Sequence, residues 1–367
     1  MPPVLTKPSS HTFDSLIGHD LARRYLASAT EGGILPHAIL IHGPRGVGKT
    51  SMAYALAKLV NTPEGSSADW VADVDRKITE GVFPDLLLVE PRGAAGQITL
   101  SGWKPGKDDP DGLQYYRFID SRPMEGVRKV LIIRQAERMN VALANHLLKL
   151  IEEPPSYLLV ILLTHRKSEV LTTIRSRCAP VKLSPLSMEE MERFASRALD
   201  PPPTGADLQM LLRLSEGRPG LMLELAGAAG VRRRAETARL MRFFQQYGFL
   251  GLFRVASELQ RAGSEGSGRS GAAAQEDFEA ALGALQGWLR DAQILKSVSS
   301  PEKAERFLVN ADLRQELEAY ASQATLEGLA AAAERVREAY QYVPRQTDKS
   351  FVLEMLLLQI GRAMRPQ

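Results

Sequence analysis

Residues Gly43-Pro-Arg-Gly-Val-Gly-Lys-Thr50 have the spacing of a phosphate-binding loop. The apolar run 37–42 before them predicts a strand, and the apolar residues of 49–60 recur at helical spacing. Glycines let successive backbone N–H groups turn toward a phosphate, Lys49 reaches the outer phosphates, and Thr50 can hold Mg²⁺ at the helix N-terminus. A Gly-rich turn could match this spacing by chance, but the strand and helix around it favour a nucleotide site.

Further apolar runs alternate with a helical pattern along the first half of the chain. Strands are expected at 86–89, 130–133 and 158–163, with a helix at 140–153 between the last two. Strands rich in Val, Ile and Leu that alternate with helices predict a parallel sheet with helices on both faces. After Pro185 the strand signals stop and the pattern is helical, and the Gly/Ser/Ala-rich stretch 262–274 predicts a flexible loop.

Composition limits the class of protein. At 367 residues, of which 44% are hydrophobic and 24% charged, a soluble protein of two or three domains is expected. The net charge of +3 leaves room for basic faces without predicting nucleic-acid binding. Cys178 is the single cysteine, which excludes an intramolecular disulfide and a Cys-based zinc cluster. The sequence has no signal-like N-terminus and no apolar stretch long enough to span a bilayer, so a cytoplasmic protein without a membrane partner is expected.

The strand ending at Ile133 lacks the acidic residues that hydrolysis needs. In phosphate-loop NTPases an Asp at a neighbouring strand end helps to hold the metal, and an acidic neighbour often prepares the attacking water. Here Arg134 and Gln135 occupy these positions. A guanidinium cannot coordinate Mg²⁺ and an amide is a poor base, so binding without turnover is expected. The alternative is that Glu137 takes over, although it lies beyond the strand end, where catalytic geometry tolerates little displacement.

Two more motifs carry a family resemblance. They are Ala144-Asn-His-Leu-Leu-Lys-Leu-Ile-Glu-Glu-Pro-Pro155 and Thr173-Ile-Arg-Ser-Arg-Cys178. Together with the phosphate-binding loop, they resemble the bacterial clamp-loader ATPases of the AAA+ superfamily, and within that group the delta-prime subunits of DNA polymerase III. The resemblance covers roughly residues 10–225, and the rest of the chain agrees only in being helical. The helix in 140–155 has a core face, whereas its end could be a solvated surface or a subunit contact.

The resemblance implies roles for individual residues. Arg177 would be an arginine finger that acts in trans on the ATP of a neighbouring subunit; the alternative is that Arg175 and Arg177 merely pair with surface carboxylates. Thr164, with His165, matches the position that senses the γ-phosphate in active relatives, and its alternative role is to cap a buried strand. The expected nucleotide-binding residues are Gly43, Gly46, Val47, Gly48, Lys49, Thr50, Ser51 and Thr164.

Three departures from the family pattern refine the expectation. Many relatives bind zinc through four cysteines, but residues 61–82 contain none, so no zinc or other protein-held metal is expected. The replaced acidic pair points away from the motor subunits and toward the delta-prime role. Where motor subunits place a phosphate-contacting Arg in the lid, this chain has Gly220, with Arg218 two residues earlier as the alternative.

The resemblance therefore implies a fold and a function. The fold would be an α/β AAA+ phosphate-loop domain (1–185), a small helical lid (186–228) and an all-helical collar for oligomerisation (229–367), although a plain helical bundle also explains the last part. The subunit would bind ATP or ADP, with Mg²⁺ at Thr50 where present, and would not hydrolyse it. Its partners would be the gamma/tau motor subunits, the delta subunit, the sliding clamp and primed DNA, which it would contact through phosphates. The alternatives are an active motor subunit using Lys49, Thr50 and Glu137, and a nucleotide-binding regulator unconnected with replication.

Overall fold

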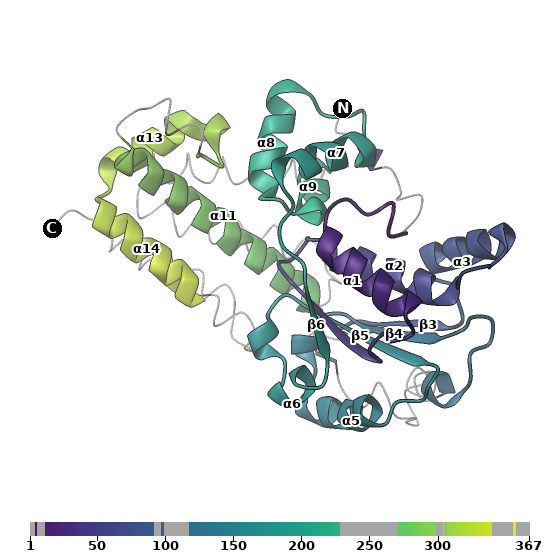
Figure 1. Ribbon diagram of the computed structural model, residues 1–367. Coiled ribbons are helices and arrows are strands. Elements are labelled where there is room, and N and C mark those ends of the chain that lie inside the picture. Colours follow the sequence, from purple (N-terminus) through teal and green to yellow (C-terminus); the bar gives the residue numbers. More distant parts are fainter. Residues whose placement is uncertain are drawn as a thin grey trace.

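Five parallel strands form the central sheet, in the spatial order β3-β4-β5-β2-β6 (Figure 1). The structure is a computed structural model that describes residues 4–5, 12–91, 97–98, 117–227, 271–298, 304, 307–339 and 355–356. The strands are β2 (Ala38–His42), β3 (Leu86–Val89), β4 (Lys129–Ile133), β5 (Leu158–Thr164) and β6 (Ala179–Lys182). Because every pair is parallel, all five strands end at the same edge of the sheet.

Helices cover both faces of the sheet, because its strands are apolar on both sides. In β4, Val130 and Ile132 pack into the core on one face, whereas Leu131 and Ile133 pack into the core on the other. Each fully buried aliphatic side chain of this kind stabilises the fold by about 1.5–3 kcal/mol. The first face carries α1 (Asp20–Glu31), α2 (Lys49–Asn61) and α3 (Ala68–Glu80), and the second carries α5 (Val141–Glu152) and α6 (Thr172–Arg175) (Figure 1).

The predicted α/β phosphate-loop fold is confirmed. Strands β2 to β5 and helices α2 and α5 lie within one residue of their expected bounds. Strand β6 was not expected, because it is an edge strand in which Val181 is buried while Pro180 and Lys182 are exposed. Proline is tolerated at such an edge, but the resulting pattern is too short and too polar to read as a strand.

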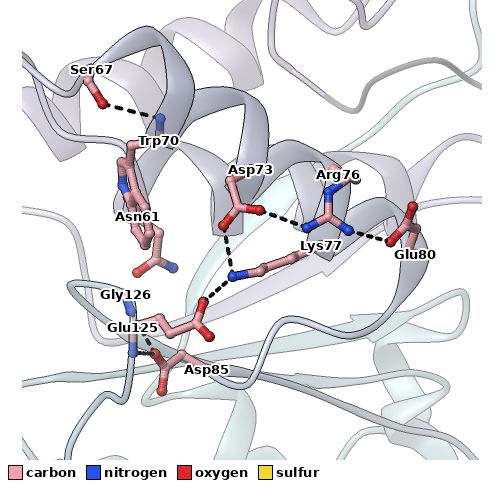
Figure 2. A network of polar contacts seen from close by, with 10 residues as sticks. All are labelled: Asn61, Ser67, Trp70, Asp73, Arg76, Lys77, Glu80, Asp85, Glu125 and Gly126. Carbon is pink, nitrogen blue, oxygen red and sulfur yellow. Dashed lines mark hydrogen bonds and ion pairs between the residues drawn. The ribbon is translucent and has the colours of Figure 1, made fainter.

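Two buried polar side chains fix the segment that leads into β4 (Figure 2). The carboxylate of Asp85 accepts hydrogen bonds from the backbone N–H groups of Met124, Glu125 and Gly126 at 2.7–3.0 Å. Asn61 Oδ1 accepts two more from the backbone of residues 127 and 128 at 2.8 and 2.9 Å. These bonds satisfy the buried side chains of Asp85 and Asn61, so they set where β4 begins.

A second helical cluster follows the sheet and has its own core. It comprises α7 (Met188–Ala198), α8 (Gly205–Ser215) and α9 (Pro219–Ala226), around buried residues such as Met191, Leu211 and Met222. A capping box between Ser187 and Glu190 defines the start of α7. The expectation that no strand follows Pro185 was wrong for one short element. Strand β7 (Leu199–Asp200) pairs antiparallel with β1 (Val4–Leu5), and two residues are too few to give a periodic signal.

The remaining described elements form a third, all-helical core. They are α11 (Gly271–Ser297), α13 (Arg314–Gln323), α14 (Leu326–Ala339) and the short 3₁₀ turn η4 (Ala311–Leu313). Trp288 and Tyr320 pack edge to face, with ring centroids 6.0 Å apart. Among the described residues, none of the helices combines the length and the apolarity needed to cross a membrane.

The flexible loop predicted for 262–274 is corrected at its end. Helix α11 begins at Gly271, so residues 271–274 are helical. The three alanines that suggested a loop by composition are strong helix formers, and their propensity prevails here. Residues 262–270 lie outside the described part of the chain, as does most of the apolar pattern expected in 351–360, of which Leu356 is buried in the helical core.

Candidate nucleotide site

The phosphate-binding loop joins the carboxyl end of β2 to the first turn of α2. A Cβ at Gly43 would lie 2.2 Å from the carbonyl oxygen of Leu183, so no side chain fits there. Gly46 and Gly48 have φ of 79° and 103°, a region that glycine adopts without strain. The loop thus has the strand-loop-helix context that presents backbone N–H groups to an anion at a helix N-terminus.

Lys49 folds back over this loop. Its ammonium donates to the carbonyl oxygens of Gly43 at 2.8 Å and Pro44 at 2.7 Å. Burial lowers the pKa of Lys49 to about 8; the charge of Glu137 raises it, and the charges of Arg134 and Arg45 lower it further. A phosphate group beside Lys49 would favour the charged ammonium and so reverse this shift.

The other expected loop residues lie where the sequence placed them. Val47 is buried, and its carbonyl oxygen is 2.9 Å from Nε2 of His19, which immediately precedes α1. Thr50 and Ser51 are partly buried on the first turn of α2. Helix α1 therefore supports the loop through His19, a contact between residues 28 positions apart that sequence reasoning missed.

Glu137 lies inside the site, although it does not continue β4. Gln135 adopts the left-handed conformation, with φ of 53°, and the chain then enters the 3₁₀ turn η2 (Ala136–Arg138). The Glu137 side chain is only 3% exposed, and Oε1 lies 2.6 Å from Nδ1 of His165. Burial raises the pKa of Glu137, but the hydrogen bond and charge of His165, with a hydrogen bond from Thr164, lower it overall.

This pairing decides what Glu137 can do. Burial lowers the pKa of Lys49 and the charge of Glu137 partly offsets this, so the carboxylate is closer to the loop than its place in the sequence indicated. The same carboxylate is buried and has His165 as its ion-pair partner. A general base must be able to accept a proton from water, and a carboxylate whose pKa is held low is a weak one.

Thr164 ends β5 and caps the turn that follows it. Its Oγ1 accepts a hydrogen bond from the backbone N–H of Arg166 at 3.0 Å, and the side chain is buried. The carbonyl oxygen of Thr164 accepts a hydrogen bond from the N–H of Gly43 at 3.3 Å. The residue therefore connects β5 directly to the loop, and it makes the strand-capping contact that sequence reasoning gave as the alternative role.

Arg177 lies at the opposite edge of the sheet from the loop. It precedes β6, whose Ala179 is opposite Ile39 and whose Lys182 is opposite His42 in the parallel pairing with β2. The four residues of β6 separate the amino end of the strand, where Arg177 lies, from its carboxyl end, beside the loop, by roughly 13 Å at about 3.3 Å per residue. Arg177 is therefore on the wrong side of the sheet to serve the nucleotide of its own chain.

The contacts of the two neighbouring arginines differ. Arg177 Nε lies 2.6 Å from Glu152 Oε1 at the end of α5, and its side chain is 43% exposed. Its Nη1 also donates to the carbonyl oxygen of Thr173 at 3.1 Å, whereas Arg175 donates to the carbonyl oxygen of Lys167 and to the hydroxyl of Thr172. Arg177 is thus the arginine presented to solvent, already paired with a surface carboxylate.

The helical cluster touches the loop through Gly220. The backbone N–H of Gly220 donates to the carbonyl oxygen of Gly46 at 2.7 Å. Arg218, the sequence alternative for a phosphate contact in the lid, directs its guanidinium to Glu216 at 3.0 Å and to the carbonyl oxygen of Ser215 at 3.3 Å. Gly220 and Arg218 thus have different surroundings, and of these two residues Gly220 is the one that bonds to the loop.

Metal-binding chemistry is sparse in the described residues. Within that part of the chain, His, Cys, Asp and Glu form no group of three or more that could hold a metal ion. Cys178 is buried, and burial raises its pKa to about 11, so its thiol stays protonated. The absence of zinc stays a prediction.

Comparisons with known proteins agree with the motifs. The model of the family described as "DNA polymerase III, delta subunit" matches residues 18–187. The DNA polymerase III subunit delta' of Pseudomonas aeruginosa is 32% identical over 206 residues, which cover 54% of this chain and 58% of that protein. The DNA polymerase III subunit tau of Escherichia coli is 32% identical over 211 residues, which cover 56% of this chain and 31% of that protein. The chain therefore matches only part of the length of each relative.

One solved structure extends over most of the chain. A DNA polymerase III gamma subunit-related protein from Thermotoga maritima is 18% identical, with a TM-score of 0.43, and the match covers 93% of this chain and 99% of that one. At this TM-score the likeness adds nothing to the fold described above.

Proposed function

We propose that this chain, whose residues 18–187 belong to the clamp-loader family of DNA polymerase III subunits, is a delta-prime-like subunit that binds nucleotide without hydrolysing it and supplies Arg177 to a neighbour. The observation that carries the proposal is the placement of Arg177 at the sheet edge opposite its own phosphate-binding loop. A guanidinium there can reach only the nucleotide of another subunit. Such a finger stabilises the charge that develops on the γ-phosphate during transfer.

The lack of turnover rests on the residues around Lys49. Arg134 and Gln135 stand where hydrolysing relatives need acidic groups, and neither can hold Mg²⁺ or act as a base. Glu137 is paired with His165. The loop itself is intact, so we infer that ATP or ADP is bound by Gly43, Gly46, Val47, Gly48, Lys49, Thr50 and Ser51, with Thr164 beside them. Thr50 is the loop residue that could contact a Mg²⁺ ion accompanying the nucleotide.

The wider role follows from the names of the relatives. In this proposal the chain works in the cytoplasm with gamma/tau motor subunits and a delta subunit, and the assembly places a sliding clamp on primed DNA. Residues 1–185 form the AAA+ domain, 186–228 the lid, and 229–367 the collar through which subunits assemble. Any contact with DNA is to phosphates and independent of sequence.

A motor subunit is the second candidate, because the tau relative is as similar as the delta' relative and Glu137 lies within electrostatic reach of Lys49. In that case the chain alone would hydrolyse ATP, and substitution of Lys49 or Glu137 would abolish the activity. A nucleotide-binding regulator outside replication would form no stable complex with the motor subunits.

The deciding experiment is ATP hydrolysis by a loader reconstituted from this chain, gamma/tau, delta, the clamp and primed DNA. We expect the isolated chain to be inert. Arg177→Ala should slow the stimulated rate of an assembled complex, because one motor site loses its finger, whereas Arg76→Ala on the exposed face of α3 should not. Hydrolysis by the chain alone would favour the motor candidate. An unchanged rate with Arg177→Ala would contradict the proposed role of Arg177 as a finger.

A further inference from the structure

The side chain of Arg134 belongs to the same face of the sheet as the phosphate-binding loop. Its backbone N–H donates to the carbonyl oxygen of Val89 at 2.9 Å, so the residue continues the ladder between β4 and β3. Alternate residues of a strand point to the same face, and Val130 and Ile132 pack on the face that carries α2. Arg134 therefore projects toward the helix that Lys49 begins.

Strand register places Arg134 level with the loop. Ile133 is opposite Leu162 in β5, and Leu163 is opposite Ile41 in β2, so Arg134 is level with the last residues of β2. Two strand spacings, about 10 Å in all, separate the backbones of β4 and β2. Burial lowers the pKa of Lys49 and raises the pKa of Tyr54 on α2; the charge of Arg134 acts to lower both, which agrees with this position.

Glu90 is the partner of Arg134 in this structure. It follows β3 directly, and the two side chains form an ion pair in which both are more than two-fifths exposed. An exposed pair of this kind is weak, typically about 0–1 kcal/mol, so the guanidinium can exchange partners at little cost. A phosphate group is a stronger partner for arginine, because it accepts two parallel hydrogen bonds.

The site suits a polyphosphate better than a metal-polyphosphate complex. Mg²⁺ is usually held by one or two carboxylates together with the substrate phosphates. Here Arg134 occupies the position of the metal-binding Asp, and Glu137 is paired with His165. The neighbouring side chains of Lys49 and Arg45 are also positively charged. The charges of Arg134, Lys49 and Arg45 would repel a divalent ion and attract the phosphates, and the Glu137 carboxylate alone opposes them among the groups named here.

We propose that this chain binds ATP or ADP without the Mg²⁺ ion that Thr50 could contact, and that Arg134 leaves Glu90 to pair with the phosphates in the place that Mg²⁺ holds in hydrolysing relatives. The inference rests on the nucleotide binding of the proposed function and not on the role of Arg177. It also gives a reason for the lack of turnover, since a fixed guanidinium neutralises phosphate charge but cannot orient a metal-bound water.

The test is equilibrium binding of ATP and of ADP to the full chain by titration calorimetry, with Mg²⁺ or with EDTA. We expect the two dissociation constants of the unchanged chain to agree within about threefold. Arg134→Gln should weaken binding in EDTA by at least about tenfold, as expected for the loss of one charged hydrogen-bonded pair at about 1.4 kcal/mol per tenfold. Arg134→Asp should bind well only with Mg²⁺. Arg76→Gln removes an exposed charge on α3 and is the matched control, with no expected change.

Three results would overturn the inference: binding that strengthens tenfold or more on adding Mg²⁺, binding by Arg134→Gln equal to that of the unchanged chain, or no binding in either buffer. Thermal unfolding of each variant excludes loss of structure as the cause. Absence of binding in either buffer would also contradict the nucleotide binding of the proposed function. The role of Arg177 is tested separately, by the Arg177→Ala hydrolysis assay. Glu90→Gln releases Arg134 and should bind at least as tightly as the unchanged chain.

Discussion

The backbone N–H of Gly220 donates a 2.7 Å hydrogen bond to the carbonyl oxygen of Gly46, which joins the first turn of α9 to the phosphate-binding loop. The two backbones are so close that a Cβ at Gly220 would lie 2.9 Å from Gly46 Cα and 3.1 Å from its oxygen. The contact therefore requires glycine at 220, where motor relatives are expected to carry arginine. It holds the start of α9 against the loop.

Gly220→Ala should separate these two elements. The added methyl meets backbone atoms, which cannot rotate away, so we expect a loss of about 1–3 kcal/mol in the free energy of unfolding. Gly227→Ala is the control, because its Cβ would make only ordinary contacts, at 3.5 Å or more. Urea unfolding of both variants measures the difference. Equal midpoints would mean that the close contact between Gly220 and Gly46 does not contribute to stability.

Glu152 is expected to position the finger. Its carboxylate lies 2.6 Å from Arg177 Nε and holds an otherwise exposed side chain in one orientation. In the reconstituted loader, Glu152→Ala should lower the stimulated hydrolysis less than Arg177→Ala does, and the double variant should be no slower than Arg177→Ala alone. Such non-additivity is typical of residues that act as a unit.

Glu153 is the matched control for this experiment, since it is the next residue and is also exposed. Glu153→Ala should leave the rate unchanged. If Glu152→Ala and Glu153→Ala behave alike, the ion pair is only a surface contact and the positioning role fails. Additive losses in the double variant would contradict it equally.

Local signals explain how much of the fold the sequence predicted. The loop 43–50 and the apolar runs around it are each set by neighbours in the chain, so their bounds were predicted to within a residue. The short strands β6 and β7 depend on pairing with distant segments, and their few residues carry no period of their own. Tertiary pairing decides such elements.

The site was harder to predict for the same reason. Glu137 reaches the loop because Gln135 takes a left-handed conformation that a non-glycine residue seldom adopts. Its pairing with His165 joins the ends of two strands, β4 and β5, and only the adjacency of these strands in a parallel sheet hints at it. Asp85 is fully buried and holds the segment before β4, a contact that sequence reasoning did not anticipate.

Nucleotide binding should depend on pH through Lys49. Because its pKa is lowered to about 8 in the free chain, the ammonium loses its proton as the pH rises above 8. Phosphate favours the protonated form, so affinity should be nearly constant from pH 6.5 to about 7.5 and then fall by up to about tenfold per pH unit. Calorimetry in buffers of different ionisation enthalpy should detect proton uptake at pH 8.5, and affinity that stays constant to pH 9.5 would contradict this.

The same shift has a consequence for stability, with the opposite sign. Between pH 8 and the ordinary lysine pKa near 10.5, the unfolded chain binds more protons at Lys49 than the folded chain does. The contribution of this group to the free energy of unfolding therefore rises with pH across that window. Burial lowers the pKa of Lys58 to about 8 as well, so Lys49→Met should reduce the rise without abolishing it, which urea unfolding of both proteins at pH 7.5 and pH 9.5 would measure.

Asp85 is expected to be the most sensitive polar position in the described part of the α/β domain. Asp85→Ala leaves the N–H groups of Met124, Glu125 and Gly126 without their acceptor (Figure 2). Hydrogen bonds to a charged group contribute about 1.5–3 kcal/mol each, so a loss of at least about 3 kcal/mol in the free energy of unfolding is expected. Asp85→Asn keeps one acceptor oxygen, so its free energy of unfolding should lie between those of the unchanged chain and Asp85→Ala.

Asp73→Ala is the control, on the exposed side of the same network. It should shift the urea midpoint far less, because its ion pairs face solvent. Equal shifts for Asp85→Ala and Asp73→Ala would mean that the segment before β4 is held by its apolar contacts and not by this carboxylate.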